Sequence, residues 1–553
     1  HIDCAAMSSL YRRYTATLLV LLAFLPPCAM AASPADGEPA PATSAIFDSP
    51  RLMSHYLAAE IAVHNGDLEA AFEHYLQIID EADDVSIARR ATHIGLHLKS
   101  DAVLQTASLW TRLAPGDVEA WKALLLLRIN AGDRSGAQQA MQSLMETAAA
   151  MHSDGFIQVA AIVAESSNQQ LGLELTRNLA ASHAEDARAH YALALAYFSQ
   201  KQSEAAERSL RRALELKKDD PKIWILLARI LDAQKRTDDS EALLQQGLEH
   251  LPDNDLLRLS YAEHLVIHEK YEQAYREFRL LHEALPENDE ITQALGSLAI
   301  ELNMWSDARE IWSGMMERKE KRDHALYFLA QIEESSGDPV KALDYYSKVG
   351  GVLRTDAKIR SAQLLAKQGD LAKALLMIST TRITAMEDAV RLYLAESDLL
   401  TASNKSMQAM ALLDKALAEH PRQIDLLYAR GMLGDDMGSL HILERDMRAI
   451  LEIDAENAQA LNALGYTLAN HGERLEEAHE LINKAYKLMP ESAAILDSMG
   501  WIEFRLGNYA AAEKYLRMAA ERDDDSEIMA HLGEVLWVTA VSYTHLTLPT
   551  ICF

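Results

Sequence analysis

The feature that most constrains this chain is a repeat of 34 residues in its middle. Five windows of this length follow one another without a gap, beginning at Ala187, Pro221, Asp255, Asp289 and Asp323. Every window has a small residue at its eighth position (Ala194, Ala228, Ala262, Gly296, Ala330) and at its twentieth (Ala206, Ser240, Ala274, Ala308, Ala342). Every window has a large apolar residue at its seventh position (Leu193, Leu227, Tyr261, Leu295, Leu329) and at its twenty-fourth (Leu210, Leu244, Phe278, Trp312, Tyr346). Self-similarity at a fixed period of this length is typical of helical-repeat arrays.

This alternation predicts a pair of antiparallel helices in each window. A small side chain is needed where two helices cross, because their backbones approach closely there, and large apolar side chains fill the flanks of the crossing. Glycines lie between the helices and prolines close many repeats, as at Gly337 and Pro252. The composition agrees, since 49% of residues are apolar and only 6% are aromatic, and the common residues favour helix over strand. We therefore predict an all-α fold.

The repeat resembles the tetratricopeptide consensus. Trp121 and Trp224 stand at its fourth-position tryptophan, and Gly465, Gly500 and Gly533 stand at its eighth-position glycine. The resemblance implies a right-handed superhelical solenoid over residues 51–540, with about 14 repeats and the last one truncated. Residues 84–116 and 153–186 fit the consensus poorly, and residues 471–476 contain a small insertion, so we expect irregular repeats there.

In this family the second, fifth, ninth and twelfth residues of a repeat face a concave groove that binds partners. The resemblance places these residues in the partner-binding groove: Arg188, Tyr191, Leu195, Phe198, Arg229, Asp232, Glu263, Tyr327, Asn462, Tyr466, Asp497, Trp501 and Arg505. Aromatic residues exposed on such a groove are typical interface anchors. The alternative is that the aromatic members pack against the adjacent repeat.

The two ends of the chain are predicted to lie outside the repeat array. Residues 1–6 precede Met7 and are interpreted as upstream non-native residues, and residues 7–31 have the basic start and apolar run of a signal peptide. A Pro-rich linker over 32–50 follows, and residues 541–553 lose the helical period and are interpreted as a non-native tail. Two processing routes stay open. Ala29-Met30-Ala31 favours cleavage to a soluble periplasmic protein, whereas Cys28 offers lipidation and an outer-membrane anchor, although Pro27 departs from the lipoprotein pattern.

The sequence carries no motif that indicates catalysis, so we expect no enzyme activity, no cofactor and no metal site. No nucleotide-binding glycine loop, nucleophile elbow or zinc-protease motif occurs in the 553 residues. His93 with His97 and His264 with His268 have the spacing of metal ligands on one helix face, but with 20 histidines in the chain we interpret both pairs as solvated or groove-lining. A net charge of −29 argues against nucleic acid as a partner, since binding phosphates requires Lys and Arg.

The C-terminal block is similar to that of proteobacterial lipoprotein adaptors that bind a periplasmic carboxyl-terminal processing protease. The similarity lies in the segments 462–468 and 496–501, which read NALGYTL and LDSMGW. It implies an exported scaffold that recruits this serine protease and its substrates, such as cell-wall hydrolases. Two alternatives remain: a scaffold of an exopolysaccharide or secretion assembly, and the non-catalytic part of a truncated enzyme.

Overall fold

The computed structural model describes residues 49–381, 385–472 and 474–547, with side chains up to residue 539. Within these ranges the chain forms helices and turns and no strand. It divides between Asn288 and Asp289 into two compact units, which are described separately below. None of the described helices is both long enough and apolar enough to cross a bilayer. The predicted signal peptide, Cys28 and most of the predicted linker lie outside the described residues.

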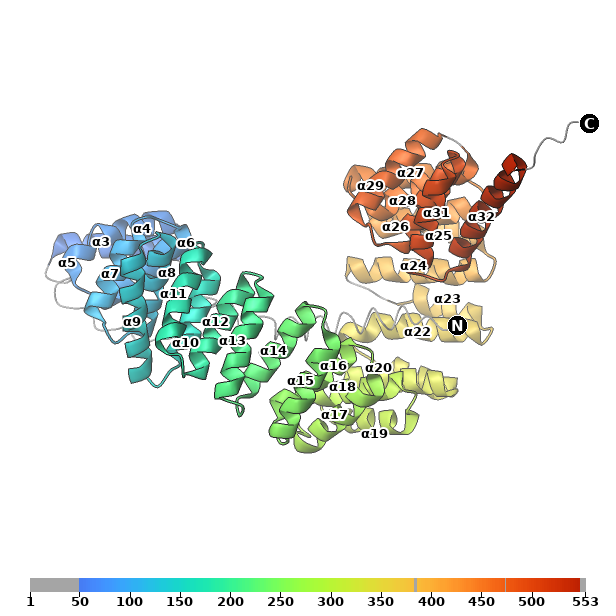
Figure 1. The fold of residues 1–553 in the computed structure, drawn as a ribbon. Helices are drawn as coiled ribbons and strands as arrows, with labels where there is room; N and C mark the ends of the chain where they lie inside the picture. Colours follow the sequence, from blue (N-terminus) through green and yellow to red (C-terminus); the bar gives the residue numbers. More distant parts are fainter. Residues whose placement is uncertain (1–48, 382–384, 473, 548–553) are drawn as a thin grey trace, which may run out of the picture. The chain divides into compact units, whose positions relative to one another are not determined.

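Unit 1 contains the helices up to residue 288, and successive helices pack as antiparallel pairs (Figure 1). They are α3 (Pro50–His64), α4 (Leu68–Leu76), α5 (Ile79–Ala82), α6 (Val85–Leu98), α7 (Val103–Leu113), α8 (Val118–Asn130), α9 (Arg134–Ala150), α10 (Gly155–Glu165), α11 (Gln169–Ser182), α12 (Ala187–Ser199), α13 (Ser203–Leu216), α14 (Pro221–Ala233), α15 (Thr237–His250), α16 (Asp255–Ile267) and α17 (Tyr271–Ala284).

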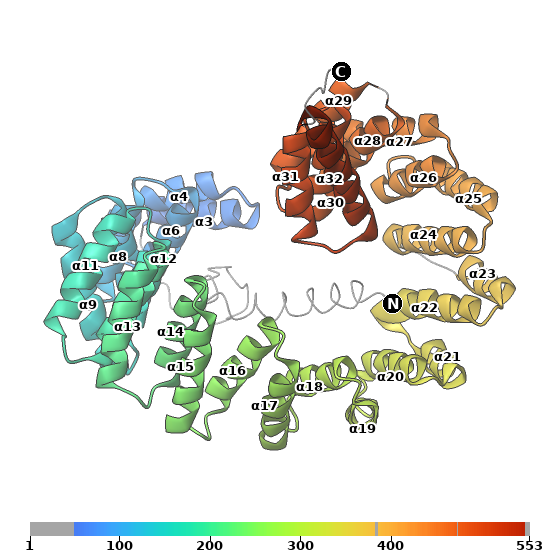
Figure 2. The same cartoon turned by 45° about the vertical axis from the view of Figure 1, so that its right-hand side comes forward.

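Unit 2 continues the same arrangement, and Figure 2 shows its helices from a second side. Its helices are α18 (Asp289–Glu301), α19 (Trp305–Met315), α20 (Arg322–Ser336), α21 (Pro339–Lys348), the 3₁₀ helix η1 (Gly351–Leu353), α22 (Arg354–Lys367), α23 (Leu371–Ser379), α24 (Met386–Ala402), α25 (Ser406–Glu419), α26 (Ile424–Asp436), α27 (Leu440–Ile453), α28 (Ala458–His471), α29 (Leu475–Leu488), α30 (Ala493–Arg505), α31 (Tyr509–Ala520) and α32 (Ser526–Thr547).

The predicted register is confirmed at the helix starts. Four of the five windows begin where α12, α14, α16 and α18 begin, and α20 begins one residue before its window. The reason is local, because the residue before the window caps the helix. Asp186, Asp220 and Asn254 each accept a hydrogen bond from a backbone N–H in the first turn. The prediction of an all-α array of antiparallel helix pairs is therefore confirmed within each unit.

The small residues lie at the helix crossings, as predicted. All ten eighth- and twentieth-position residues of the five windows are buried, and so are the ten large apolar residues beside them. Gly296 shows why the position must be small. A Cβ atom there would lie 2.7 Å from Nε1 of Trp312, the twenty-fourth residue of the same window. Gly465 behaves in the same way, because a Cβ atom there would lie 2.6 Å from Cγ1 of Ile482. Steric exclusion at these crossings fixes the pairing of the helices.

The segments that fit the consensus poorly still form helix pairs. Residues 84–116 form α6 and α7, and residues 153–186 form α10 and α11, of which α10 has only 11 residues. Two short elements interrupt the alternation elsewhere, α5 and η1. At the C-terminal end, α32 continues to Thr547, whereas the sequence predicts an end near Ala540. The origin of the tail stays a prediction.

Candidate partner-binding site

Four predicted groove residues lie on α12 in unit 1, and they differ in exposure. Phe198 is 36% exposed, whereas Tyr191 and Leu195 are half-buried, and Leu195 packs against the core of the neighbouring repeats. Burial, followed by the charge of Asp220, raises the pKa of Tyr191 to about 12. Arg188 is held by its own helix cap, since its Nη2 lies 2.6 Å from Oδ2 of Asp186. Phe198 is therefore the most accessible apolar member of this group.

The next three predicted residues lie on α14 and α16. Arg229 is exposed on α14, and Glu263 is half-buried on α16. Burial raises the pKa of the Glu263 carboxyl, while the positive charge of Arg229 acts in the opposite direction. Asp232 is turned toward two histidines of α16, and its Oδ2 lies 3.2 Å from Nδ1 of His264. Unit 1 thus offers charged side chains from two successive first helices.

In unit 2, Tyr327 does not lie on an accessible face. It is buried on α20, where its ring contacts Phe328 and Tyr346, the latter at a centroid distance of 5.7 Å. Burial raises the pKa of the Tyr327 hydroxyl. Asn462 on α28 is half-buried, and its Oδ1 accepts no hydrogen bond from any described residue. Tyr327 is therefore not available to a partner, whereas Asn462 lies one helical turn from Tyr466 on the same helix.

The remaining predicted residues are brought together with α32. We call Tyr466, Asp497, Trp501, Glu527 and His531 the C-terminal cluster. Nδ1 of His531 lies 3.0 Å from both carboxylate oxygens of Asp497, and the His531 ring stacks on Trp501 at 4.2 Å between centroids. The Tyr466 hydroxyl donates a hydrogen bond of 2.5 Å to Oε1 of Glu527. Three successive first helices, α28, α30 and α32, are thereby joined.

Trp501 packs against the adjacent repeat and is not exposed on a groove, which is the alternative given for the aromatic groove residues. Trp501 is only 7% exposed, because His531 covers one face of its indole. Arg505, on the same helix, lies 5.9 Å from the Trp501 ring and donates through Nη1 to the backbone carbonyl of Asn470 at 2.9 Å. Neither His531 nor Glu527 is among the groove residues predicted from the sequence. That these residues bind a partner stays a prediction.

The ionisation of His531 gives the C-terminal cluster a testable pH dependence. Burial lowers the pKa of His531, but the hydrogen bond and the negative charge of Asp497 outweigh it, so the pKa lies above the usual value of about 6.5. The stabilisation by this pair is therefore fully present below about pH 6.5 and is lost as the pH rises through the raised pKa. We expect hydrogen-exchange protection of α30 and α32 to fall as the pH is raised over this range. His531→Gln should remove this pH dependence. The control His441→Gln, at an exposed site, should keep it. If His531→Gln showed the same pH dependence of exchange as the unmodified chain, the assignment to His531 would be contradicted.

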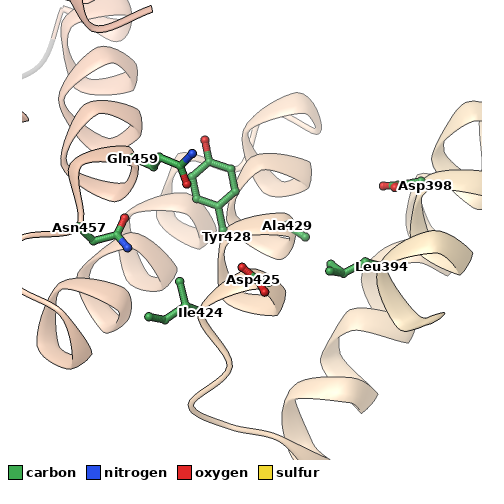
Figure 3. A pocket seen from close by; sticks show the side chains of 8 residues that line it. All are labelled: Leu394, Asp398, Ile424, Asp425, Tyr428, Ala429, Asn457 and Gln459. Atoms are coloured by element: carbon green, nitrogen blue, oxygen red, sulfur yellow. The ribbon is translucent and has the colours of Figure 1, made fainter. Parts of the chain in front are cut away.

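A shallow hollow lies in unit 2, on the first helices of three successive repeats. It is a cavity of about 290 Å³ (Figure 3). Its lining comes from α24 (Leu394, Asp398), α26 (Ile424, Asp425, Tyr428, Ala429) and the start of α28 with its cap (Asn457, Gln459). We call it the α26 pocket. Asp425 and Leu394 point into the space between α24 and α26 in Figure 3.

The α26 pocket has the chemistry of a site for a cationic side chain. Asp398 and Asp425 are exposed, and within the described ranges neither forms an ion pair with Lys, Arg or His. Tyr428 is half-buried beside them and supplies an aromatic face, with Leu394 and Ile424 as apolar walls. Half of the lining residues are polar and half are apolar or aromatic, so the pocket can contact both the charged end and the aliphatic part of a side chain. Two carboxylates without a cation attract Lys or Arg of a partner.

None of the pocket residues is among the groove residues predicted from the sequence, although the sequence holds a signal for three of them. If Gly431 and Gly465 are eighth-position glycines, Asp425 and Gln459 fall at second positions and Tyr428 at a fifth, which are groove positions. Asp398 and Leu394 could not be found in this way, because α24 has 17 residues and lacks the regular register.

Comparison with known proteins agrees with the repeat architecture. Over 480 residues the chain is 32% identical to TPR repeat-containing protein PA4667 of Pseudomonas aeruginosa, covering 86% of this chain and 81% of the relative. Bacteriophage adsorption protein A of Escherichia coli is 28% identical over 87 residues, which cover 16% of this chain and 9% of that protein. Family models described as tetratricopeptide repeat match residues 187–220, 204–263 and 472–527, and the first of these ranges coincides with the first 34-residue window.

Two solved structures are also similar over most of their length. They are the structure of Naa15/Naa10 bound to HypK-THB (12% identity, TM-score 0.32, covering 90% of this chain and 98% of that chain) and the APC/C hetero-tetramer Cut9-Hcn1 (14% identity, TM-score 0.31, covering 88% and 96%). The extended identity to the Pseudomonas aeruginosa protein and the matched repeats show the family. The chain belongs to the tetratricopeptide-repeat (TPR) proteins and is a scaffold for protein–protein interaction.

Proposed function

We propose that the chain is an exported adaptor that recruits a periplasmic carboxyl-terminal processing protease and its substrates. The observation that carries the binding role is the α26 pocket, which spans three successive repeats and holds two carboxylates without a cationic partner among the described residues. The choice of a protease rests on the similarity of segments 462–468 and 496–501 to those of the lipoprotein adaptors. These segments lie on α28 and α30, and α28 also contributes to the pocket.

The pocket fits a particular step of recognition. A Lys or Arg side chain of the partner would enter between Asp398 and Asp425, and its aliphatic part would lie along Leu394 and Tyr428. The net charge of −29 would attract a basic segment before contact. Second-helix faces do not contribute to this pocket, which agrees with partner binding on first helices.

The test measures binding of the purified full chain to the purified protease and to a cell-wall hydrolase. We expect Asp425→Lys combined with Tyr428→Ala to weaken binding of the partner by at least about tenfold, because a charge reversal is added to the loss of an aromatic contact. Asp523→Lys with Tyr509→Ala is the matched control, since Asp523 lies in an exposed turn and Tyr509 on the second helix α31. The control should bind like the unmodified chain.

The protease step is tested separately from binding. Addition of the chain should speed cleavage of the hydrolase by the protease. If the chain binds neither protein, and affinity capture from an envelope extract recovers polysaccharide-export or secretion components instead, the assembly-scaffold alternative replaces the adaptor. Export and anchoring have their own measurement, which is cell fractionation together with lipid labelling of the chain and of Cys28→Ser. Recovery in the cytoplasm would contradict export, and labelling that is lost in Cys28→Ser would show the outer-membrane anchor.

A further inference from the structure

We propose that Asp232, His264 and His268 form a binding site for a divalent transition-metal ion of the zinc class. Asp232 lies on α14, and His264 lies on α16, which also ends at the cap residue His268. The sequence alone presents the two histidines as a pair one helical turn apart and offers no third ligand. The fold supplies that ligand from the preceding repeat. This inference is independent of the proposed adaptor role.

The spacing of the three side chains suits a metal ion. One ligand atom from each residue lies within 4.8 Å of the other two. Oδ2 of Asp232 is 3.2 Å from Nδ1 of His264, and Oδ1 of Asp232 is 3.9 Å from Nε2 of His268. Zinc bound at about 2.0 to 2.2 Å in a tetrahedron has ligand atoms about 3.3 to 3.5 Å apart. Separations of up to 4.8 Å would have to close by up to about 1.5 Å, through rotation of the side chains, to complete the site.

Two buried polar atoms of these residues lack a hydrogen-bond partner among the described residues. His264 is 4% exposed, and its Nε2 is buried without a hydrogen-bond partner among the described residues. Oδ1 of Asp232 is also buried and accepts no hydrogen bond within the described part of the chain. Buried polar atoms without a partner are rare in proteins and indicate a missing ligand, water or ion. Oδ1 of Asp232 lies 3.9 Å from Nε2 of His268 and belongs to the cluster, so it is the atom that indicates a ligand there. Nε2 of His264 is on the other side of the ring from Nδ1, the nitrogen that faces Asp232, and does not take part in the same site.

The ligand set and its surroundings agree with this class of ion. Two imidazoles and one carboxylate are ligands that zinc and its neighbours in the first transition series prefer. The ammonium group of Lys270, whose charge acts on His268, is paired with Glu241, with 2.5 Å between Nζ and Oε2. Side-chain exposures of 34% for Asp232 and 29% for His268 leave the site open to solvent, so a water molecule or a partner side chain can supply the fourth ligand.

The second histidine pair gives an internal comparison. His93 and His97 have the same spacing on α6, but within the described part of the chain no third ligand lies close to both of them. Coordination at Asp232, His264 and His268 would join the first helices of two successive repeats. Such a link would restrain the spacing of α14 and α16 on the face that also carries Arg229 and Glu263.

The test uses the untagged full chain after treatment with a chelator, and Zn²⁺ and Co²⁺ as probes. Titration calorimetry should show one site per chain that is weakened by at least about tenfold in His268→Ala and in Asp232→Asn. His97→Ala is the matched control and should bind like the unmodified chain. Both ligand variants change partly exposed residues, so circular dichroism should confirm that they fold. Zn²⁺ should also slow hydrogen exchange in α14 and α16 of the unmodified chain and not in Asp232→Asn.

Several outcomes would overturn the assignment. One is that the unmodified chain binds Zn²⁺ no more tightly than the His268→Ala variant does. Another is a site that His97→Ala weakens as much as His268→Ala does. Co²⁺ provides a further check, because bound Co²⁺ with nitrogen ligands in a tetrahedral site absorbs visible light strongly. No change in that absorption between the unmodified chain and Asp232→Asn would also exclude the site.

Discussion

Replacing Ala274 by Glu should unfold the helix pair α16 and α17. Ala274 is fully buried where these helices cross, and Ala262, on the facing helix, is fully buried as well. Overpacking alone costs about 1 to 3 kcal/mol, and a carboxylate buried without a partner adds to it. We therefore expect the local free energy of unfolding to fall by about 4 kcal/mol or more. Few single substitutions destabilise a protein this much, and burial of an unpaired charge is one of the causes. Hydrogen exchange of α16 and α17, together with thermal melting by circular dichroism, measures the loss.

The same helix provides the control for this substitution. Ala284 is exposed at the end of α17, so Ala284→Glu introduces the same charge without burial. Its melting curve should follow that of the unmodified chain. Because each repeat contacts mainly its neighbours, the loss of protection in Ala274→Glu should be largest in α14 to α17 and small in distant repeats of unit 1. A melting curve and exchange pattern unchanged by Ala274→Glu would contradict the role of small residues at the crossings.

The second large effect is expected at the buried ion pair of Arg430 and Asp446, which joins α26 to α27. The Asp446 side chain is 1% exposed, and Arg430 holds it with two hydrogen bonds of 2.7 and 2.8 Å. Arg430→Met should cost about 3 to 5 kcal/mol, because it leaves a buried carboxylate with too few donors. Urea unfolding of the chain and hydrogen exchange of α26 and α27 measure this change.

Asp446 supplies two comparisons of its own. Arg445 also donates to Oδ1 of Asp446, at 2.8 Å, but its side chain is 57% exposed. Arg445→Met should therefore cost no more than about 1 kcal/mol. Combining Arg430→Met with Asp446→Leu should restore most of the stability, since apolar side chains can replace a buried ion pair. If Arg430→Met were as mild as Arg445→Met, the buried pair would not stabilise the repeat.

The repeat register could be predicted from the sequence, because the signals that set it are local. Asp186, Asp220 and Asn254 cap helices at the predicted starts, and the small residues at the crossings recur at a fixed spacing. The course of α32 was harder to predict. Its residues up to Thr547 continue the helix, although they lack the apolar period that packing against a second helix produces.

The contacts between repeats could not be predicted in this way. The sequence placed Tyr466 and Trp501 at groove positions, but whether such a ring is open or covered depends on the next first helix. Glu527 accepts the hydrogen bond of Tyr466 from 61 residues away, and His531 stacks on Trp501 from 30 residues away. If Gly533 is an eighth-position glycine, Glu527 falls at a second position, which is a groove position, but His531 falls at a sixth, which the groove rule does not include. Asp232 and His264 are 32 residues apart, so their contact crosses the repeat diagonally and a period of 34 does not reveal it.

The α26 pocket rests on three first helices that belong to different repeats. Its two carboxylates lie on α24 and α26, and its amides lie at the start of α28, so no single helix pair contains the complete site. A force that increases the spacing between α24, α26 and α28 would therefore move the carboxylates and the amides of the pocket apart, while each helix stays intact. We therefore expect the affinity of the pocket for a partner to depend on the spacing between these repeats, and to fall when that spacing increases.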